Sequence, residues 1–153
     1  MATLTVTHTE DITLNGQQFG GTTIKTFLSI NEIVKRILTI TTTECVIATF
    51  SSAVASAGHY VAADVRYIRF TNRDNTNFVT LTFRNQDNDE IAMKVDAGNS
   101  FMVFADNSGG MVGIFNATQD ADAASDTALG SITNIQADAN TGNCDLEVFI
   151  AST

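Results

Sequence analysis

The feature that most constrains the fold is an alternation of apolar and polar residues with a period of two, interrupted at short intervals by Asn, Asp and Gly. Successive side chains of a strand point to opposite faces, so this period indicates half-buried strands. The alternation is clearest in residues 64–71, 77–84 and 90–95, and it returns in 144–151. The chain contains no Pro, so its turns must depend on Gly, Asn and Asp.

Two of these turns share one pattern. The segments Phe70-Thr-Asn-Arg-Asp-Asn75 and Phe83-Arg-Asn-Gln-Asp-Asn88 both read Phe-x-Asn-x-Asp-Asn, 13 residues apart. This spacing equals one strand plus one turn, and Asn and Asp side chains end strands by hydrogen bonding to their own backbone. We therefore expect residues 64–95 to form a β-meander, in which each strand pairs with the next.

Further β-rich runs cover residues 2–7, 11–15, 22–30, 44–50, 101–104 and 131–138. Residues 32–42 are ambiguous, because Ile33 and Ile37 fit one face of a helix whereas Val34 and Leu38 fit an alternating strand. The density of β-branched residues favours a strand in this segment, with room for one helical turn before it.

Two segments are expected to be loops. A run of small residues extends from Ser51 to Gly58. Residues 105–128 are rich in Gly, Ala and Asp around a short apolar island at Met111–Phe115, and we expect a long loop or protrusion there.

Many short strands at close spacing predict an all-β fold, an antiparallel β-sandwich of the jelly-roll type. The length of 153 residues predicts a single domain over 1–153, large enough to hold a core without metals or disulfides. The last strand reaches almost to Thr153, so the C-terminus should be tied into a sheet. The only cysteines, Cys45 and Cys144, lie in strand-like segments and are expected to be buried free thiols, although a single bridge between them stays open.

The charge of the chain excludes some partners. Its net charge is −9, so duplex nucleic acid and anionic membrane are poor partners. Charged residues make up 16%, against about 25% in a typical soluble domain. That depletion fits either an ordinary Thr- and Asn-rich β protein or a surface that contacts another protein. All eight bases lie at or before Lys94, but strands from the two parts of a β fold interleave, so we expect the charges to mix on the surface.

No catalytic constellation is visible, so we expect no enzyme and no cofactor. His8 and His59 lack the spacing of a metal-ligand pair. Neither cysteine has an evident base, and neither the Gly-x-Ser-x-Gly elbow nor a phosphate-binding glycine loop is present.

Calcium is the least weak of the metal hypotheses. One candidate cluster is Asp120, Asp122 and Asp126, and a second is Asp87, Asp89 and Glu90. Clustered carboxylates suit hard cations, but neither cluster matches a known calcium loop, so solvated turn residues are the preferred interpretation.

Three stretches of the chain resemble small structural proteins of tailed bacteriophages, in particular those of marine and cyanobacterial phages. They are Val65-Arg-Tyr-Ile-Arg-Phe-Thr-Asn-Arg-Asp-Asn-Thr-Asn-Phe-Val79, then Asp96-Ala-Gly-Asn-Ser-Phe101, and then Ile132-Thr-Asn-Ile-Gln-Ala-Asp-Ala-Asn through Asp145-Leu-Glu-Val-Phe-Ile-Ala-Ser-Thr153. The resemblance covers roughly residues 30–153. It implies a β-sandwich virion component present in many copies, and it assigns no role to any single residue.

The expected function is therefore that of a virion structural protein, a capsid decoration (cement) or related accessory subunit. It would bind the particle surface as a homo-oligomer, a trimer or another ring, through loops near 51–62 and 105–128. Its partners would be copies of itself and other virion proteins, such as the major capsid protein or tail proteins. The N-terminus shows no signal peptide, so we expect synthesis in the host cytoplasm and a final place in the virion.

The alternative is a tail- or fibre-associated carbohydrate-binding adhesin module. Sandwich folds often carry sugar sites on their loops. The chain has no Trp and only two Tyr, and its Phe residues mostly fall in alternating runs that suit a core.

Overall fold

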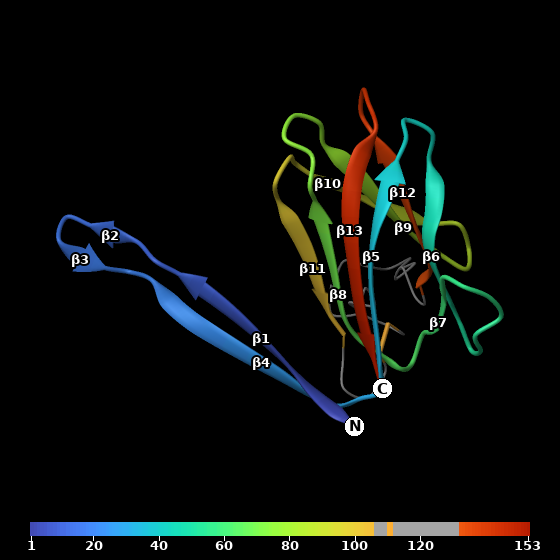
Figure 1. The fold of residues 1–153 in the computed structure, drawn as a ribbon, viewed down its shortest axis with the longest axis horizontal. Helices are drawn as coiled ribbons and strands as arrows, with labels where there is room; N and C mark the ends of the chain where they lie inside the picture. The colour runs from blue at the N-terminus through green and yellow to red at the C-terminus, as the bar shows by residue number, and fades with distance from the viewer. Residues whose placement is uncertain (106–109, 112–131) are drawn as a thin grey trace, which may run out of the picture.

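The computed structural model describes residues 1–105, 110–111 and 132–153. Within these ranges the chain forms strands and turns and no helix, so the all-β prediction is confirmed. The body consists of two packed sheets, and a narrow two-stranded ribbon projects from one end of it (Figure 1). No helix in the described ranges is long and apolar enough to cross a membrane.

The body has two sheets. The first has the order β11-β8-β13-β5 and is built from β5 (Glu32–Ile40), β8 (Val65–Asn72), β11 (Ser100–Phe104) and β13 (Cys144–Ser152). The second has the order β10-β9-β12-β6-β7 and is built from β6 (Cys45–Ser51), β7 (His59–Val61), β9 (Val79–Asn85), β10 (Glu90–Val95) and β12 (Ile132–Ala139).

The strand order is that of a jelly roll. The chain folds as one long hairpin that is rolled up, because β5 pairs with β13, β6 with β12, β8 with β11, and β9 with β10. These pairs alternate between the two sheets, which is the two-sheet architecture that the sequence predicted. Every pair in the described structure is antiparallel except the short edge pair of β6 and β7, which is parallel.

The predicted β-meander over 64–95 is wrong. Only β9 and β10 pair as a hairpin, whereas β8 and β9 lie in different sheets. Phe70 and Phe83, which begin the two repeated turn patterns, face each other across the core with ring centroids 6.4 Å apart. The connection from β8 to β9 covers 73–78, which is longer than the 86–89 connection of the hairpin. It can therefore cross the gap of about 10 Å between packed sheets.

The ambiguous segment 32–42 is a strand, β5, and its inward side chains close one side of the sandwich. Arg36 points inward, and its Nη2 donates a hydrogen bond to the Ile47 carbonyl of β6 at 2.5 Å, which links edge strand β5 of one sheet to the other sheet. At the other end of the chain the Thr153 N–H donates to the Asp64 carbonyl at 2.9 Å. The expectation that the C-terminus is tied into a sheet is confirmed.

Two expectations about single residues are corrected. The cysteines are free, but only Cys144 is buried, because Cys45 lies at the exposed start of β6. Met111, expected in a protrusion, is buried in the core, and its N–H donates to the Ala62 carbonyl at 2.8 Å. Ala105, at the start of the same expected loop, is buried too. The rest of 105–128 lies outside the described residues, apart from Gly110.

Candidate interaction surface

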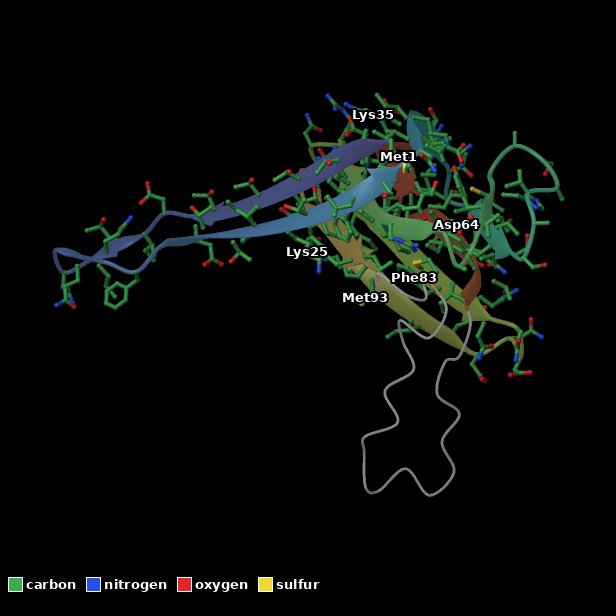
Figure 2. The ribbon with its side chains drawn as sticks, turned by 90° about the horizontal axis from the view of Figure 1, so that it is seen from below. Met1, Lys25, Lys35, Asp64, Phe83 and Met93 are labelled. Carbon is green, nitrogen blue, oxygen red and sulfur yellow. The ribbon has the colours of Figure 1, made fainter. Side chains whose placement is uncertain are left out.

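The ribbon that leaves the body is an N-terminal arm, residues 1–30. It consists of β1 (Ala2–Glu10) paired with β4 (Gly21–Ile30), and it ends in a small hairpin of β2 (Thr13–Leu14) and β3 (Gln17–Gln18). In the described structure neither β1 nor β4 pairs with a strand of the body. Figure 2 shows the distal part of the arm as a long extension clear of the two sheets.

The tip of the arm has a defined local structure. Asn15 and Gly16 both have positive φ, 52° and 79°, which is the geometry that an Asn-Gly turn adopts in a two-residue hairpin. The Gln18 amide donates to the Asp11 carboxylate at 2.6 Å and accepts from the Thr13 hydroxyl at 2.9 Å. The tip therefore presents one ordered surface.

The base of the arm is docked on the outer face of the β11-β8-β13-β5 sheet. Phe27 is buried there, with its ring centroid 6.2 Å from that of Tyr67 and 6.3 Å from that of Phe104. Ile30 is buried beside it, and the smaller cluster also contains Leu4, Val6, Met102, Phe149 and Ala151. A β-bulge near Ser29, where φ is 61°, shifts the register between the two arm strands just beside this contact.

Beyond Val6 and before Phe27, every residue of β1 and β4 is exposed on both faces of the ribbon. A two-stranded hairpin alone is marginally stable in water. The arm also carries six large exposed apolar side chains of the described structure: Met1, Ile12, Leu14, Phe19, Ile24 and Leu28. Exposed apolar groups on a ribbon with unpaired edges and no Pro are typical of a surface that contacts another chain.

A second unusual surface lies on the outer face of the same sheet, beside the docked arm base. Glu147 of β13 points outward, yet its side chain is only 6% exposed. It is enclosed by three bases from the first half of the chain: Arg69 Nη2 at 2.6 Å, Arg73 Nη1 at 3.0 Å and Lys35 Nζ at 3.5 Å. Burial alone would raise the pKa of Glu147, but the charge of Lys35 and the hydrogen bonds of Arg69 and Arg73 hold it below its usual value.

The charges of the two halves therefore mix, as the sequence analysis favoured, but a local excess of positive charge remains. Lys35 is flanked on the outer face of β5 by Ile33 and Ile37, whose side chains are 54% and 56% exposed. We call this surface the basic face, defined by Ile33, Lys35, Ile37, Arg69 and Arg73. It combines exposed apolar groups with three bases around one buried acid, on a chain whose net charge is −9.

The calcium candidates Asp87, Asp89 and Glu90 form no metal site in the described structure. Asp87 and Asp89 lie exposed in the turn between β9 and β10, where the Asn85 amide donates to Asp89 at 3.1 Å. Glu90 forms an ion pair with Arg84. No group of three His, Cys, Asp or Glu that could hold a metal occurs in the described ranges. The other candidates, Asp120, Asp122 and Asp126, lie outside the described residues.

One mainly apolar cavity of about 380 Å³ opens beside β6 and β7. Its described lining contains no ionisable side chain and consists of Phe50, Ser51, Ser52, Val61, Ala62, Ala63, Ile132 and Thr133. This part of the wall supplies no general acid or base. The expected contact segment 51–62 contributes to this wall, but it also contains the end of β6 and the strand β7, so its loop covers residues 52–58.

The sequence did not lead us to expect an arm, although β1 carries a signal for it. A sandwich strand needs one continuous apolar face, and on β1 the face that carries Leu4 and Val6 continues with His8 and Glu10. The opposite face carries only Thr from Thr3 to Thr9. A strand whose apolar face stops halfway is typical of a segment that is docked at one end only.

Comparison with protein-family models, with curated proteins and with solved structures finds no match to this chain.

Proposed function

We propose that this protein is a structural subunit of a virus particle, a capsid decoration subunit that binds the particle surface as a homo-oligomer. The observation that carries the proposal is the N-terminal arm. Its base is anchored on the jelly roll, while its distal part exposes apolar groups on an unpaired ribbon. Such an arm has a physical reason to exist where a neighbouring subunit covers it.

The body is suited to the same role. Its main core lies between the two sheets, which Arg36 also links, and no residue of the arm belongs to that core. The stretches that resemble phage structural proteins form β8 with its crossing to β9, the turn into β11, and β12 with β13. These elements are the framework of the jelly roll, so the resemblance supports a shared architecture and leaves the arm as a feature of this chain.

The test is the copy number of the protein in purified particles, measured by quantitative mass spectrometry against the major capsid protein. Tryptic reference peptides must come from residues 1–94, because no Lys or Arg follows Lys94. Hundreds of copies per particle support a decoration subunit. A few to a few dozen copies would move the protein to the neck, tail or fibres, and absence from particles would overturn the proposal.

A carbohydrate-binding adhesin is the second candidate, and one observation favours it. The arm tip exposes Phe19, which is 61% exposed, and the same tip carries the amide of Gln18 hydrogen-bonded to the carboxylate of Asp11. An aromatic face beside polar groups suits a sugar ring. A glycan array probed with folded protein tests this candidate, and a Phe19→Ala variant should lose any signal that comes from the tip.

A further inference from the structure

We infer that the arm tip of one copy docks on the basic face of a neighbouring copy, so that subunits associate head to tail. This inference rests on the proposed function, because it requires copies that assemble. The two surfaces that meet are the arm tip and the basic face, and each of them binds a second copy of this chain.

The tip is apolar and acidic. Ile12, Leu14 and Phe19 are each more than half exposed. Glu10 and Asp11 stand beside them, and the chain contains no Lys or Arg before Lys25. The hydrogen bond from Gln18 orients Asp11 without neutralising its charge.

The basic face is apolar and positive. Lys35 and Arg73 keep 58% and 53% of their side chains exposed while they also contact Glu147. A second carboxylate, Asp145, lies on the same outward side of β13 as Glu147 and accepts from the Thr39 hydroxyl at 3.2 Å. The two acids offset two of the three bases, so one positive charge remains in excess on this face. Ile33 and Ile37 provide apolar surface on either side of Lys35.

The arm tip and the basic face are complementary in apolar character and in charge. Each offers exposed branched or aromatic apolar side chains, and their charges are opposite. Complementary charge fixes the register of an interface and selects the partner. The net charge of the chain is negative and would repel the acidic tip at long range, so the basic face is its favoured docking site.

The geometry requires a second molecule. The arm leaves from the end of the body at which both termini lie and points away from it (Figure 1). In Figure 2 the tip lies at the far end of the ribbon from the labelled Lys35. The nine residues of β1 alone span roughly 30 Å at the usual rise per residue. The contact joins two different surfaces, so it is heterologous and repeats until a ring closes or a filament grows.

Charge reversal in the full-length chain tests the contact. The arm variant is Glu10→Lys with Asp11→Lys, and the face variant is Lys35→Glu. The control is Lys94→Glu, because Lys94 is equally exposed but lies on β10 of the other sheet. Sedimentation velocity over a concentration series should show association of the wild type and of the control, with dissociation constants at least about tenfold weaker for either variant alone.

Mixing separates a lost contact from a damaged fold. The arm variant has a positive tip and a positive face. The face variant has a negative tip and a negative face, because its new carboxylate joins Glu147 and Asp145 against only Arg69 and Arg73. A 1:1 mixture should therefore associate again, although neither variant does so alone. Failure of the mixture to associate, or unchanged association of either variant, would overturn the inference.

Crosslinking gives an independent test in a Cys45→Ser background. Phe19→Cys chains mixed with Ile37→Cys chains should form disulfide-linked heterodimers. Phe19→Cys mixed with Val54→Cys should not, because Val54 is as exposed as Phe19 but lies outside the basic face. Equal yields from both mixtures would overturn the inference. Particle-bound protein that shows no tip-to-face contact would overturn the inference alone, whereas absence from particles would overturn the proposed function.

Discussion

Asn72 and Asn85 occupy the same place in the two repeated turn patterns, and both amide side chains are buried at the end of a strand. The Asn72 Nδ2 donates to the Asn77 carbonyl at 2.8 Å and to the Val95 carbonyl at 3.1 Å. Its Oδ1 accepts the Asp74 N–H at 3.0 Å. One side chain therefore joins the end of β8, the crossing to β9 and the end of β10.

Asn85 uses the same chemistry for another connection. Its Oδ1 accepts the N–H groups of Asp87 at 2.9 Å and Asp89 at 2.8 Å, which closes the hairpin from β9 to β10. The same residue type in the same pattern thus ends a strand in both places, although one connection crosses between the sheets and the other closes a hairpin.

Replacing Asn72 should be costly. Asn72→Ala leaves two backbone carbonyls and one N–H without their partner in a buried position, and we expect a loss of roughly 2–4 kcal/mol in the free energy of unfolding. Urea denaturation followed by circular dichroism measures this loss. Asn75→Ala, in the same turn but exposed, should change the free energy by less than about 0.5 kcal/mol and serves as the control. Equal effects of the two variants would contradict the role of Asn72.

Replacing Phe27 should release the arm and leave the body folded. Phe27 and Leu28 are neighbours on β4, but Phe27 is buried on the sheet and Leu28 is 68% exposed. Because the arm base contacts only the outer face, Phe27→Ala should increase tryptic cleavage at Lys25 severalfold without a large change in the melting of the sandwich. Leu28→Ala should leave the cleavage rate unchanged. Cooperative unfolding of the whole chain in Phe27→Ala would show that the body depends on the arm.

The ion cluster at Glu147 should make stability depend on pH. The folded state holds the pKa of Glu147 below its ordinary value of 4.5, despite burial, because Lys35 and Arg69 favour the charged form. The stabilisation is therefore fully present above about pH 4.5 and is lost as the pH falls through the lower folded-state pKa.

Glu147→Gln measures this dependence. Denaturation curves from pH 7 to pH 3 should show a difference of roughly 2–4 kcal/mol between wild type and variant at neutral pH, which shrinks below pH 4.5. Glu32→Gln, at the exposed start of β5, should keep the wild-type free energy of unfolding at each pH and serves as the control. A difference that is independent of pH would mean that the carboxylate charge does not stabilise this face.

The two thiols should react at very different rates. Cys45 is exposed, whereas Cys144 is buried, and burial together with the nearby Asp74 and Asp145 raises the pKa of the Cys144 thiol. A thiol reagent at pH 8 should therefore modify one cysteine per chain rapidly, and the second only after denaturant is added. Mass spectrometry of the labelled protein should place the fast label on Cys45. Labelling of both thiols at one rate would contradict the described core.

Strands and turns were predictable because their signals lie between near neighbours in the sequence. The alternation in β8, β9, β10 and β13 identified the strands, because one face of each packs in the core while the other meets different surroundings. Asn15-Gly16 at the arm tip is also a local signal, since few residue pairs readily adopt two positive φ angles. The candidate site was not predictable from motifs. Glu147 and its bases are separated by 74 to 112 residues in the chain, and Arg69, Arg73 and Lys35 form no pattern with it.

By itself, the sequence determined that this chain is all-β, where most of its strands lie, and that Asn, Asp and Gly end them, because side-chain period and turn geometry act between near neighbours. Only the tertiary structure decided that β8 and β9 part to opposite sheets, that the apolar stripe of Leu4 and Val6 docks beside Tyr67, and that the rest of the arm is left without a partner. The physical reason is that strand pairing and docking are selected by which buried faces meet across the whole molecule. The relevant contacts, such as Phe27 on Tyr67 and Phe70 on Phe83, have no signature within any one segment.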